Sequence, residues 1–431
     1  MIKLHQFITD YVILVKSSIE QRVVLSVVVI RLRLKPMRSR EREEFMNFIF
    51  LSPYFPNNFY NFCVGLKEAG INVLAIGDLA YDELRAELKD SLTEYYRVDN
   101  MENYSQMQKA CGYFTYKYGK IDRIESNNEY WLETDARLRK DFNVKGLKID
   151  DIEAMKYKSK MKEVFNQAGL NTARGKVVDQ LEEAENFIEE VGYPVVVKPD
   201  NGVGAADTYK INNYEELVNF FENKLDLDYI MEEYIDGRIY TFDGLTDQDG
   251  KIVFSSSMVF NDGIMETVNN GLDMFYYIPR ELPADIVEAG RKTVEAFGLK
   301  ERFFHFEYFK MDDGRIVALE VNVRPPGGLT LDMFNYANDI DVYREYARVV
   351  QHNAFEADIS RKYNCFYIGR KNFINYKYSV DDVINNYGEH VIRHEEISPI
   401  LAPAIGDYGI ILRTESLEKG KEIVEYAMKH L

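Results

Sequence analysis

The stretch ALEVNVRPPGG, from Ala318 to Gly328, alternates apolar and polar residues as a β-strand does, and then turns at a Pro-Pro-Gly-Gly run. Side chains two residues apart in a strand point to the same side, so Glu320, Asn322 and Arg324 share one face. A half-buried strand ordinarily turns its polar face to water. Two interpretations are therefore open at this point: a solvated surface, or a site built from a carboxylate, an amide and a guanidinium.

Length and charge limit the class of protein. A chain of 431 residues exceeds what one hydrophobic core usually serves, so two or three domains are expected. Asp and Glu number 71 against 53 Lys and Arg, a formal charge of -18 that argues against nucleic acid as a partner. The three cysteines, Cys63, Cys111 and Cys365, lie far apart and form no disulfide framework. We expect an ordered protein of a reducing cytoplasm.

The first 45 residues differ from the rest. Their apolar runs, YVILV and VVLSVVVI, are shorter than the ~20 residues that a membrane helix needs, and charged residues interrupt any longer span. The dense charge of RLRLKPMRSREREEF follows and ends directly before Met46. We expect residues 1–45 to be a weakly folded extension, with a translation-start artefact as one explanation, and no membrane partner.

From Met46 onward, patterns of strand and helix alternate. MNFIFLS is typical of a strand, NNFYNFCVGLKEAG of a helix ending at Gly70, and INVLAIGD of a second strand. This order predicts an α/β protein that begins with a parallel sheet. The expected parts are the extension 1–45, a parallel-sheet α/β domain at 46–149, an α+β domain at 150–350 with a subdomain at about 170–235, and a small C-terminal α+β subdomain at 351–431.

Two lysines and a glycine loop indicate a site for phosphate. Lys158 begins an amphipathic helix in MKYKSKMKEVFNQAG, although a surface lysine is the simpler interpretation of that residue. In YPVVVKPDNGVGAADTYKI, a β-branched strand carries Lys198 into a loop with Gly202 and Gly204, and a second strand follows. The loop matches neither the Rossmann fingerprint nor the Walker motif. A hairpin turn and a phosphate clamp both remain open.

A connector follows about 30 residues later in YIMEEYIDGRIYTFDG. An apolar strand there acquires Glu232 and Glu233, passes through Tyr234 and Ile235, and turns at Asp236. Adenine requires a backbone carbonyl or carboxylate for its amine and a backbone N–H for its ring nitrogen, which such a connector supplies. A solvated strand end before a turn is the alternative.

The last pattern is FFHFEYFKMDDGRIVALEVNVRPPGG, two strands joined by the hairpin MDDG. Glu307 and Glu320 lie among apolar neighbours that cannot solvate a carboxylate. Together with the amide oxygen of Asn322 they make a set of hard ligands that magnesium accepts. His305, between two phenylalanines, is interpreted as a packed structural histidine.

Taken in order and at these spacings, the quoted segments resemble the ATP-grasp superfamily, to which biotin carboxylase, D-alanine:D-alanine ligase and L-amino acid ligases belong. The resemblance covers roughly residues 46–350, and IESNNEYWLETDARLRKDFNVKG and IYTFDG are similar to a bacterial group within it. It implies a pre-ATP-grasp domain at 46–149 and an ATP-grasp domain at 150–350. It also implies ATP and two magnesium ions, with manganese as an alternative.

The resemblance assigns roles residue by residue. Arg324 and Lys198 would be catalytic, Arg324 at the reacting carboxylate and the transferred phosphate and Lys198 at the α- and β-phosphates. Glu307, Glu320 and Asn322 would hold the metal ions. Lys158 would contact the α-phosphate, the loop of Asn201, Gly202, Val203, Gly204, Ala205 and Ala206 would close over the phosphates, and Glu232, Glu233 and Ile235 would hold adenine.

One position departs from the pattern of many ATP-grasp ligases. Those enzymes place a ribose-binding glutamate seven residues after the first connector glutamate, and this chain has Ile239 there. Asp243 is the nearest carboxylate that could replace it. We expect Asp243 to bind ribose.

The expected reaction is ATP-dependent activation of a carboxylate as an acyl phosphate, followed by attack of an amine. This chemistry needs positioning and charge neutralisation rather than a protein nucleophile. Two alternatives remain: another acyl-phosphate enzyme such as a carboxylase or an acyl-CoA synthetase half, and a non-catalytic ATP-binding sensor. The expected partners are small-molecule carboxylate and amine substrates, with a homodimer left open.

Overall fold

The structure is a computed structural model that describes residues 45–202, 207–261, 267 and 271–431. The predicted N-terminal extension lies outside these residues, apart from Phe45. Across the described part of the chain, every helix is too short or too polar to cross a bilayer. The α/β class and the parallel N-terminal sheet predicted from the sequence are confirmed. The predicted domain limits stay a prediction.

The N-terminal sheet has the strand order β3-β2-β1-β4, and its neighbouring strands run parallel. Gly70 (φ 80°) and Gly119 (φ 92°) follow the ends of helices α2 and α4 in a conformation that favours glycine. The elements of this region are β1 (Asn47–Leu51), α2 (Tyr60–Glu68), β2 (Asn72–Gly77), η1 (Tyr81–Glu83), α3 (Ala86–Ser91), β3 (Glu94–Arg97), α4 (Tyr104–Tyr118), β4 (Arg123–Glu125) and α5 (Leu132–Asp141).

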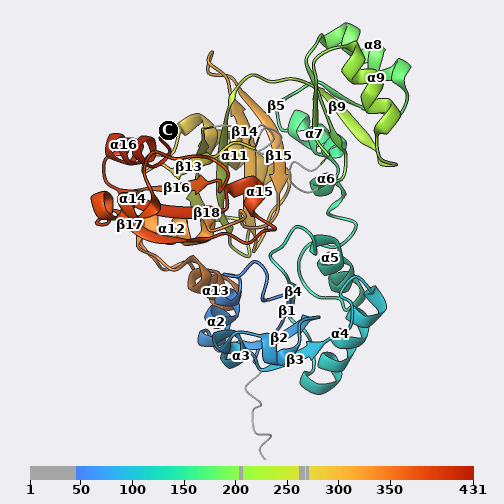
Figure 1. Ribbon diagram of the computed structural model, residues 1–431. Coiled ribbons are helices and arrows are strands. Elements are labelled where there is room, and N and C mark those ends of the chain that lie inside the picture. Colours follow the sequence, from blue (N-terminus) through green and yellow to red (C-terminus); the bar gives the residue numbers. More distant parts are fainter. Residues whose placement is uncertain (1–44, 203–206, 262–266, 268–270) are drawn as a thin grey trace, which may run out of the picture. The chain divides into compact units, whose positions relative to one another are not determined.

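A second sheet of order β6-β9-β7-β8 is antiparallel. Helices α8 and α9 lie beside this sheet (Figure 1). Their apolar side chains form a separate small core with those of β7 and β9. Two short helices precede this sheet in the chain. The bounds are α6 (Glu153–Lys156), α7 (Lys158–Gln167), β6 (Gly175–Val178), α8 (Leu181–Val191), β7 (Val195–Pro199), β8 (Tyr209–Ile211), α9 (Tyr214–Asn223) and β9 (Tyr229–Glu233).

The described residues also form a large mixed sheet of order β17-β18-β16-β13-β12-β10-β14-β15-β5, with β11 paired to β10. Its elements are β5 (Asn171–Thr172), β10 (Arg238–Thr246), β11 (Ile252–Ser256), β12 (Val259–Phe260), β13 (Met274–Ile278), α11 (Ala284–Ala296), β14 (Phe303–Lys310), β15 (Ile316–Asn322), α12 (Thr330–Asn338), α13 (Val342–His352), β16 (Asn364–Arg370), α14 (Val380–Tyr387), β17 (Val391–Glu396), α15 (Ala402–Ile405), β18 (Tyr408–Thr414) and α16 (Leu417–Ala427). The strands of the C-terminal 80 residues therefore extend this sheet.

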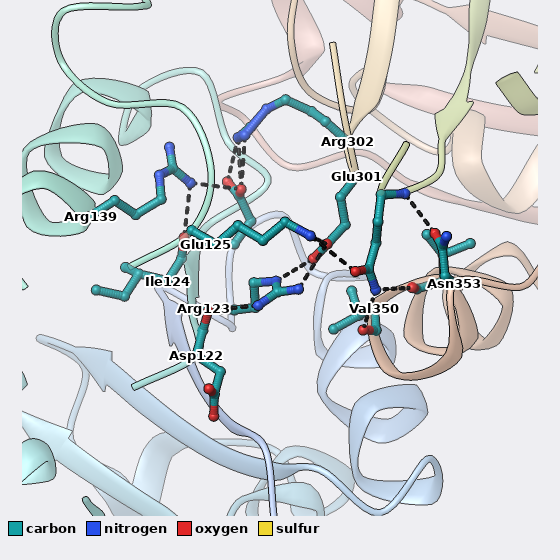
Figure 2. Close-up of polar contacts among 12 residues, drawn as sticks. Asp122, Arg123, Ile124, Glu125, Arg139, Glu301, Arg302, Val350 and Asn353 are labelled. Carbon is teal, nitrogen blue, oxygen red and sulfur yellow. Dashed lines mark hydrogen bonds and ion pairs between the residues drawn. The ribbon is translucent and has the colours of Figure 1, made fainter. Parts of the chain in front are cut away.

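A buried ionic cluster ties β4 and α5 to β14. Figure 2 shows the Glu125 carboxylate between two guanidinium groups: Arg139 donates at 2.9 Å, and Arg302 donates to both carboxylate oxygens at 2.7–2.9 Å. Arg302 also donates to the carbonyl oxygen of Val323 at 2.9 Å, directly before Arg324. The cluster thus connects the N-terminal sheet to the backbone at the end of β15.

Candidate functional site

Polar side chains line one face of the large sheet across three neighbouring strands. Thr241 on β10 pairs with Glu307 on β14, and Glu307 pairs with Glu320 on β15. Paired residues of antiparallel strands point to the same side of the sheet. Because the register shifts beside Glu307, Leu319 is left as an extra residue, and Glu320 rather than Leu319 reaches this face.

The Glu307–Glu320 pair is electrostatically unfavourable without a cation, because like charges directly opposite each other repel. Lys158 Nζ lies 3.4 Å from Glu320, and His305 Nε2 lies 3.2 Å from Glu307. Asn322, the next residue on the same face of β15, adds an amide oxygen. Two carboxylates and an amide are donors that suit magnesium. Among the described residues, no group of three or more His, Cys, Asp or Glu side chains is arranged to hold a metal ion by itself.

His305 is buried, as the sequence predicted, but its surroundings are ionic rather than aromatic. Its Nδ1 donates to Asp243 Oδ1 at 2.6 Å, and its Nε2 donates to Glu307 Oε1 at 3.2 Å. Burial favours the neutral ring, yet the two carboxylates outweigh burial and raise the pKa of His305 to about 9. The histidine therefore lies beside a candidate metal ligand, which the interpretation as a merely packed residue missed.

Asp243 is enclosed by other side chains. The residue is fully buried, one carboxylate oxygen accepts from His305, and the other accepts from the hydroxyl of Thr241. Burial raises the pKa of its carboxyl, and His305 opposes that effect. Both carboxylate oxygens of Asp243 thus already accept hydrogen bonds within the protein, and ribose binding by Asp243 stays a prediction. Ile239 packs partly buried against the apolar core.

Lys158 is not a surface residue, so the simpler interpretation of it is wrong. It opens helix α7, and only 5% of it is exposed. Its backbone N–H donates to the carbonyl of Asp200 at 2.9 Å, and its Nζ donates to the carbonyl of Gly202 at 3.2 Å. The ammonium group therefore lies between the glycine loop and Glu320, where it can meet a phosphate.

Lys198 and Glu232 form a buried cluster with a third residue that the sequence analysis missed, Lys162. Glu232 Oε2 lies 2.7 Å from Lys198 Nζ, and Glu232 Oε1 lies 2.6 Å from Lys162 Nζ. Burial opposes ionisation of the carboxyl, but the two ammonium groups outweigh it and lower the pKa of Glu232 to about 2. Burial likewise opposes the charge on Lys198, and Glu232, Glu320 and Glu307 together raise its pKa. Both carboxylate oxygens of Glu232 are therefore occupied by lysines.

The connector after β9 is the segment predicted to bind adenine. Glu233 pairs with Arg174 at 2.6 Å, and its backbone N–H donates to the carbonyl of Arg174 at 3.0 Å. The N–H is thus already used within the sheet. Ile235 is half-buried in the segment between β9 and β10. Recognition of adenine by Glu232, Glu233 and Ile235 stays a prediction.

The glycine loop joins β7 to β8, which pair as an antiparallel hairpin. Asn201 is exposed and bridges to Tyr157 next to Lys158, and Gly202 offers its carbonyl to that lysine. Closure of the loop over phosphates stays a prediction, because Val203, Gly204, Ala205 and Ala206 lie outside the described residues.

Arg324 faces a carboxylate that the sequence analysis did not assign, Glu129. Arg324 Nη2 donates to Asn322 Oδ1 at 3.2 Å, and its Nε lies 3.8 Å from Glu129 Oε2. That oxygen is buried without a hydrogen-bond partner among the described residues, and burial raises the pKa of the carboxyl against the pull of Arg324. Glu129 belongs to the quoted segment IESNNEYW, where its polar run before helix α5 was the available signal.

A comparison with protein families matches the part of the chain that contains several of these residues. The ATP-grasp domain family matches residues 191–332, which include Lys198, Glu307 and Arg324. The chain contains an ATP-grasp domain. The L-arginine-specific L-amino acid ligase of Bacillus subtilis is 25% identical to this chain over 293 residues, 64% of the chain and 70% of the relative.

Solved structures show the same fold. An L-amino acid ligase from Bacillus licheniformis superposes on this structure with a TM-score of 0.68 at 17% identity, covering 88% of this chain and 96% of that one. The biotin carboxylase domain of the 2-oxoglutarate carboxylase of Hydrogenobacter thermophilus gives a TM-score of 0.64 at 18% identity, covering 89% of each chain. That structure is a dimer holding MgADP, ADP and bicarbonate.

Proposed function

We propose that this protein is an ATP-dependent carboxylate–amine ligase, which activates a carboxylate as an acyl phosphate and joins it to an amine. One observation carries the proposal: the paired carboxylates Glu307 and Glu320, the buried lysines Lys158 and Lys198, and Arg324 opposite Glu129 all gather at one site. The relatives named as L-amino acid ligases support this class of reaction.

The nucleotide half of the reaction needs positive charge at the phosphates. Lys158 and Lys198 are buried, lie close to acidic side chains, and supply two fixed charges. Glu307, Glu320 and Asn322 would hold two magnesium ions, which neutralise phosphate oxygens when bound. The connector containing Ile235 would hold adenine. The lysines and the sheet face thus align the γ-phosphate with the attacking carboxylate.

The acyl half takes place at Arg324. An oxygen of the substrate carboxylate attacks the γ-phosphorus, and the bond from that phosphorus to ADP breaks. The amine nitrogen then attacks the acyl carbon, phosphate leaves with the electron pair of the broken C–O bond, and the amine loses a proton. The guanidinium group of Arg324 can donate hydrogen bonds to two substrate oxygens at once. Glu129, whose Oε2 lies 3.8 Å from Arg324 Nε, would accept that proton.

The test is an assay of ADP and phosphate release with a panel of amino acids and small carboxylates, with and without hydroxylamine. Hydroxylamine traps acyl phosphates as hydroxamates, so a carboxylate-dependent hydroxamate is the expected result. Nucleotide turnover that needs bicarbonate and gives no hydroxamate would favour a carboxylase instead. Binding of ATP without any turnover would favour a sensor and refute the ligase.

A further inference from the structure

A cavity of about 500 Å³ lies beside the turn that follows Arg324. Its wall contains Gly328, the β1–α2 loop, the segment after β17, and strand β17 itself. The loop contributes Asn58, whose Nδ2 donates to the carbonyl of Gly328 at 3.3 Å. Gly328 comes four residues after Arg324 in the chain, so the turn that follows β15 runs from the proposed acyl site to the wall of the cavity.

The wall of this cavity is mostly polar and carries charges of both signs. Arg85 and Arg393 supply positive charge, and Glu395 and Glu396 supply negative charge. Arg393 is fixed between two carboxylates, at 2.9 Å from Asp332 on α12 and 2.9 Å from Glu395. An apolar ligand would displace water from the exposed sides of these charged groups and offer them no hydrogen bond in exchange.

A ligand that has both an ammonium and a carboxylate group would match such a wall. Its carboxylate would lie near the arginines and its ammonium near the glutamates. The volume is well above that of a single water and is open to a molecule of amino-acid size. Strand β17 belongs to the C-terminal segment, which the sequence analysis linked to no function.

We propose that this cavity binds the amine substrate, and that Arg393 and Glu395 select an amine that also carries a carboxylate, as an amino acid does. The inference rests on the proposed ligase function and adds the substrate class and its specificity-determining residues. Arg393 and Glu395 are thereby distinguished from the residues around Arg324, which activate the carboxylate whatever the amine is.

The experiment compares two nucleophiles in one enzyme. Hydroxylamine is small enough to attack the acyl phosphate without filling the cavity, whereas an amino acid must occupy it. We expect Glu395→Gln and Arg393→Lys to raise KM for the preferred amino acid about tenfold or more, because each removes a charge or a two-pronged contact. Hydroxamate formation and KM for ATP should stay within about twofold of wild type.

Matched amines test the substrate class directly. Removing the carboxylate, as from L-alanine to ethylamine or from L-leucine to 3-methylbutylamine, should lower kcat/KM at least about a hundredfold. Glu389→Gln is the control variant, since its side chain is 83% exposed and stands outside the cavity wall.

The outcomes separate the two proposals. Suppose that hydroxamate forms but both variants keep the wild-type KM for the amino acid, or that alkylamines react as well as amino acids. Either result contradicts the proposed role of the cavity and leaves the ligase proposal intact. Absence of hydroxamate with every carboxylate overturns both.

Discussion

Glu125 and Glu129 are buried glutamates four residues apart on one segment, and they differ in their hydrogen bonding. Glu125 accepts hydrogen bonds from Arg139 and Arg302 (Figure 2), and these charges lower the pKa of its carboxyl against the effect of burial. Glu129 has a buried oxygen without a hydrogen-bond partner among the described residues, and burial raises the pKa of its carboxyl.

The difference suggests a testable distinction between a structural charge and a functional one. A buried charge that holds the fold together has partners within the protein, as Glu125 has. Glu129 instead faces Arg324 Nε at 3.8 Å with an oxygen that has no hydrogen-bond partner among the described residues. We therefore expect Glu129 to act at the proposed site around Arg324.

The largest expected effect is on stability at Glu125. Glu125→Gln removes the negative charge that two buried guanidinium groups share, so the free energy of unfolding should fall by about 3–5 kcal/mol. Glu129→Gln should leave stability within about 0.5 kcal/mol of wild type, while turnover falls about a hundredfold.

Chemical denaturation and steady-state rates measure both effects. Glu133→Gln, exposed on the following helix, is the control and should change neither. Equal loss of stability in the two buried variants would remove the distinction between these glutamates.

The next effect concerns the carboxylate pair. Glu320→Gln keeps the shape of the side chain and removes one charge from the proposed magnesium ligands, so turnover should fall by about 10²–10³-fold. The fold and most of the adenine binding should persist, as circular dichroism and nucleotide titration would show. Unchanged turnover at saturating magnesium would contradict the metal role.

Arg324→Lys should lower turnover about a hundredfold, because lysine keeps the charge but loses the two-pronged geometry. ATP affinity should change only a few-fold, since the lysines and the connector hold the nucleotide elsewhere. Arg315→Lys on the hairpin of the same strand pair is the control, with its side chain 62% exposed. Parallel losses of ATP binding and turnover would move Arg324 into the nucleotide site.

The smallest effect is the pH dependence of Glu232. Its pKa is lowered from 4.5 to about 2, so its contribution to stability is complete above pH 4.5 and is lost as the pH falls toward 2. The difference in free energy of unfolding between wild type and Glu232→Gln should therefore be about 1.4 kcal/mol smaller at pH 3.5 than at pH 7. Urea unfolding at both pH values measures this difference. If it does not change with pH, the lysines do not hold this carboxylate ionised.

Local patterns in the sequence predicted much of the fold and part of the candidate site. The βαβ order identified the parallel sheet, and the hairpin MDDG placed Glu307 and Glu320 on adjacent strands. Lys158 was correctly placed at the start of a helix, but its burial was not foreseen. Burial depends on what packs over a residue, and here that is a glycine loop more than 40 residues later in the chain.

The sequence by itself determined the elements, the alternation of faces and the residue types that suit phosphate and magnesium, because these follow from local periodicity and side-chain chemistry. Only the tertiary structure decided which charges meet. The extra residue Leu319 sets Glu320 opposite Glu307, and residues distant in sequence enclose Asp243 and bring Glu129 to Arg324. Register and long-range contacts arise from how whole strands pack, and no short stretch of sequence contains that information.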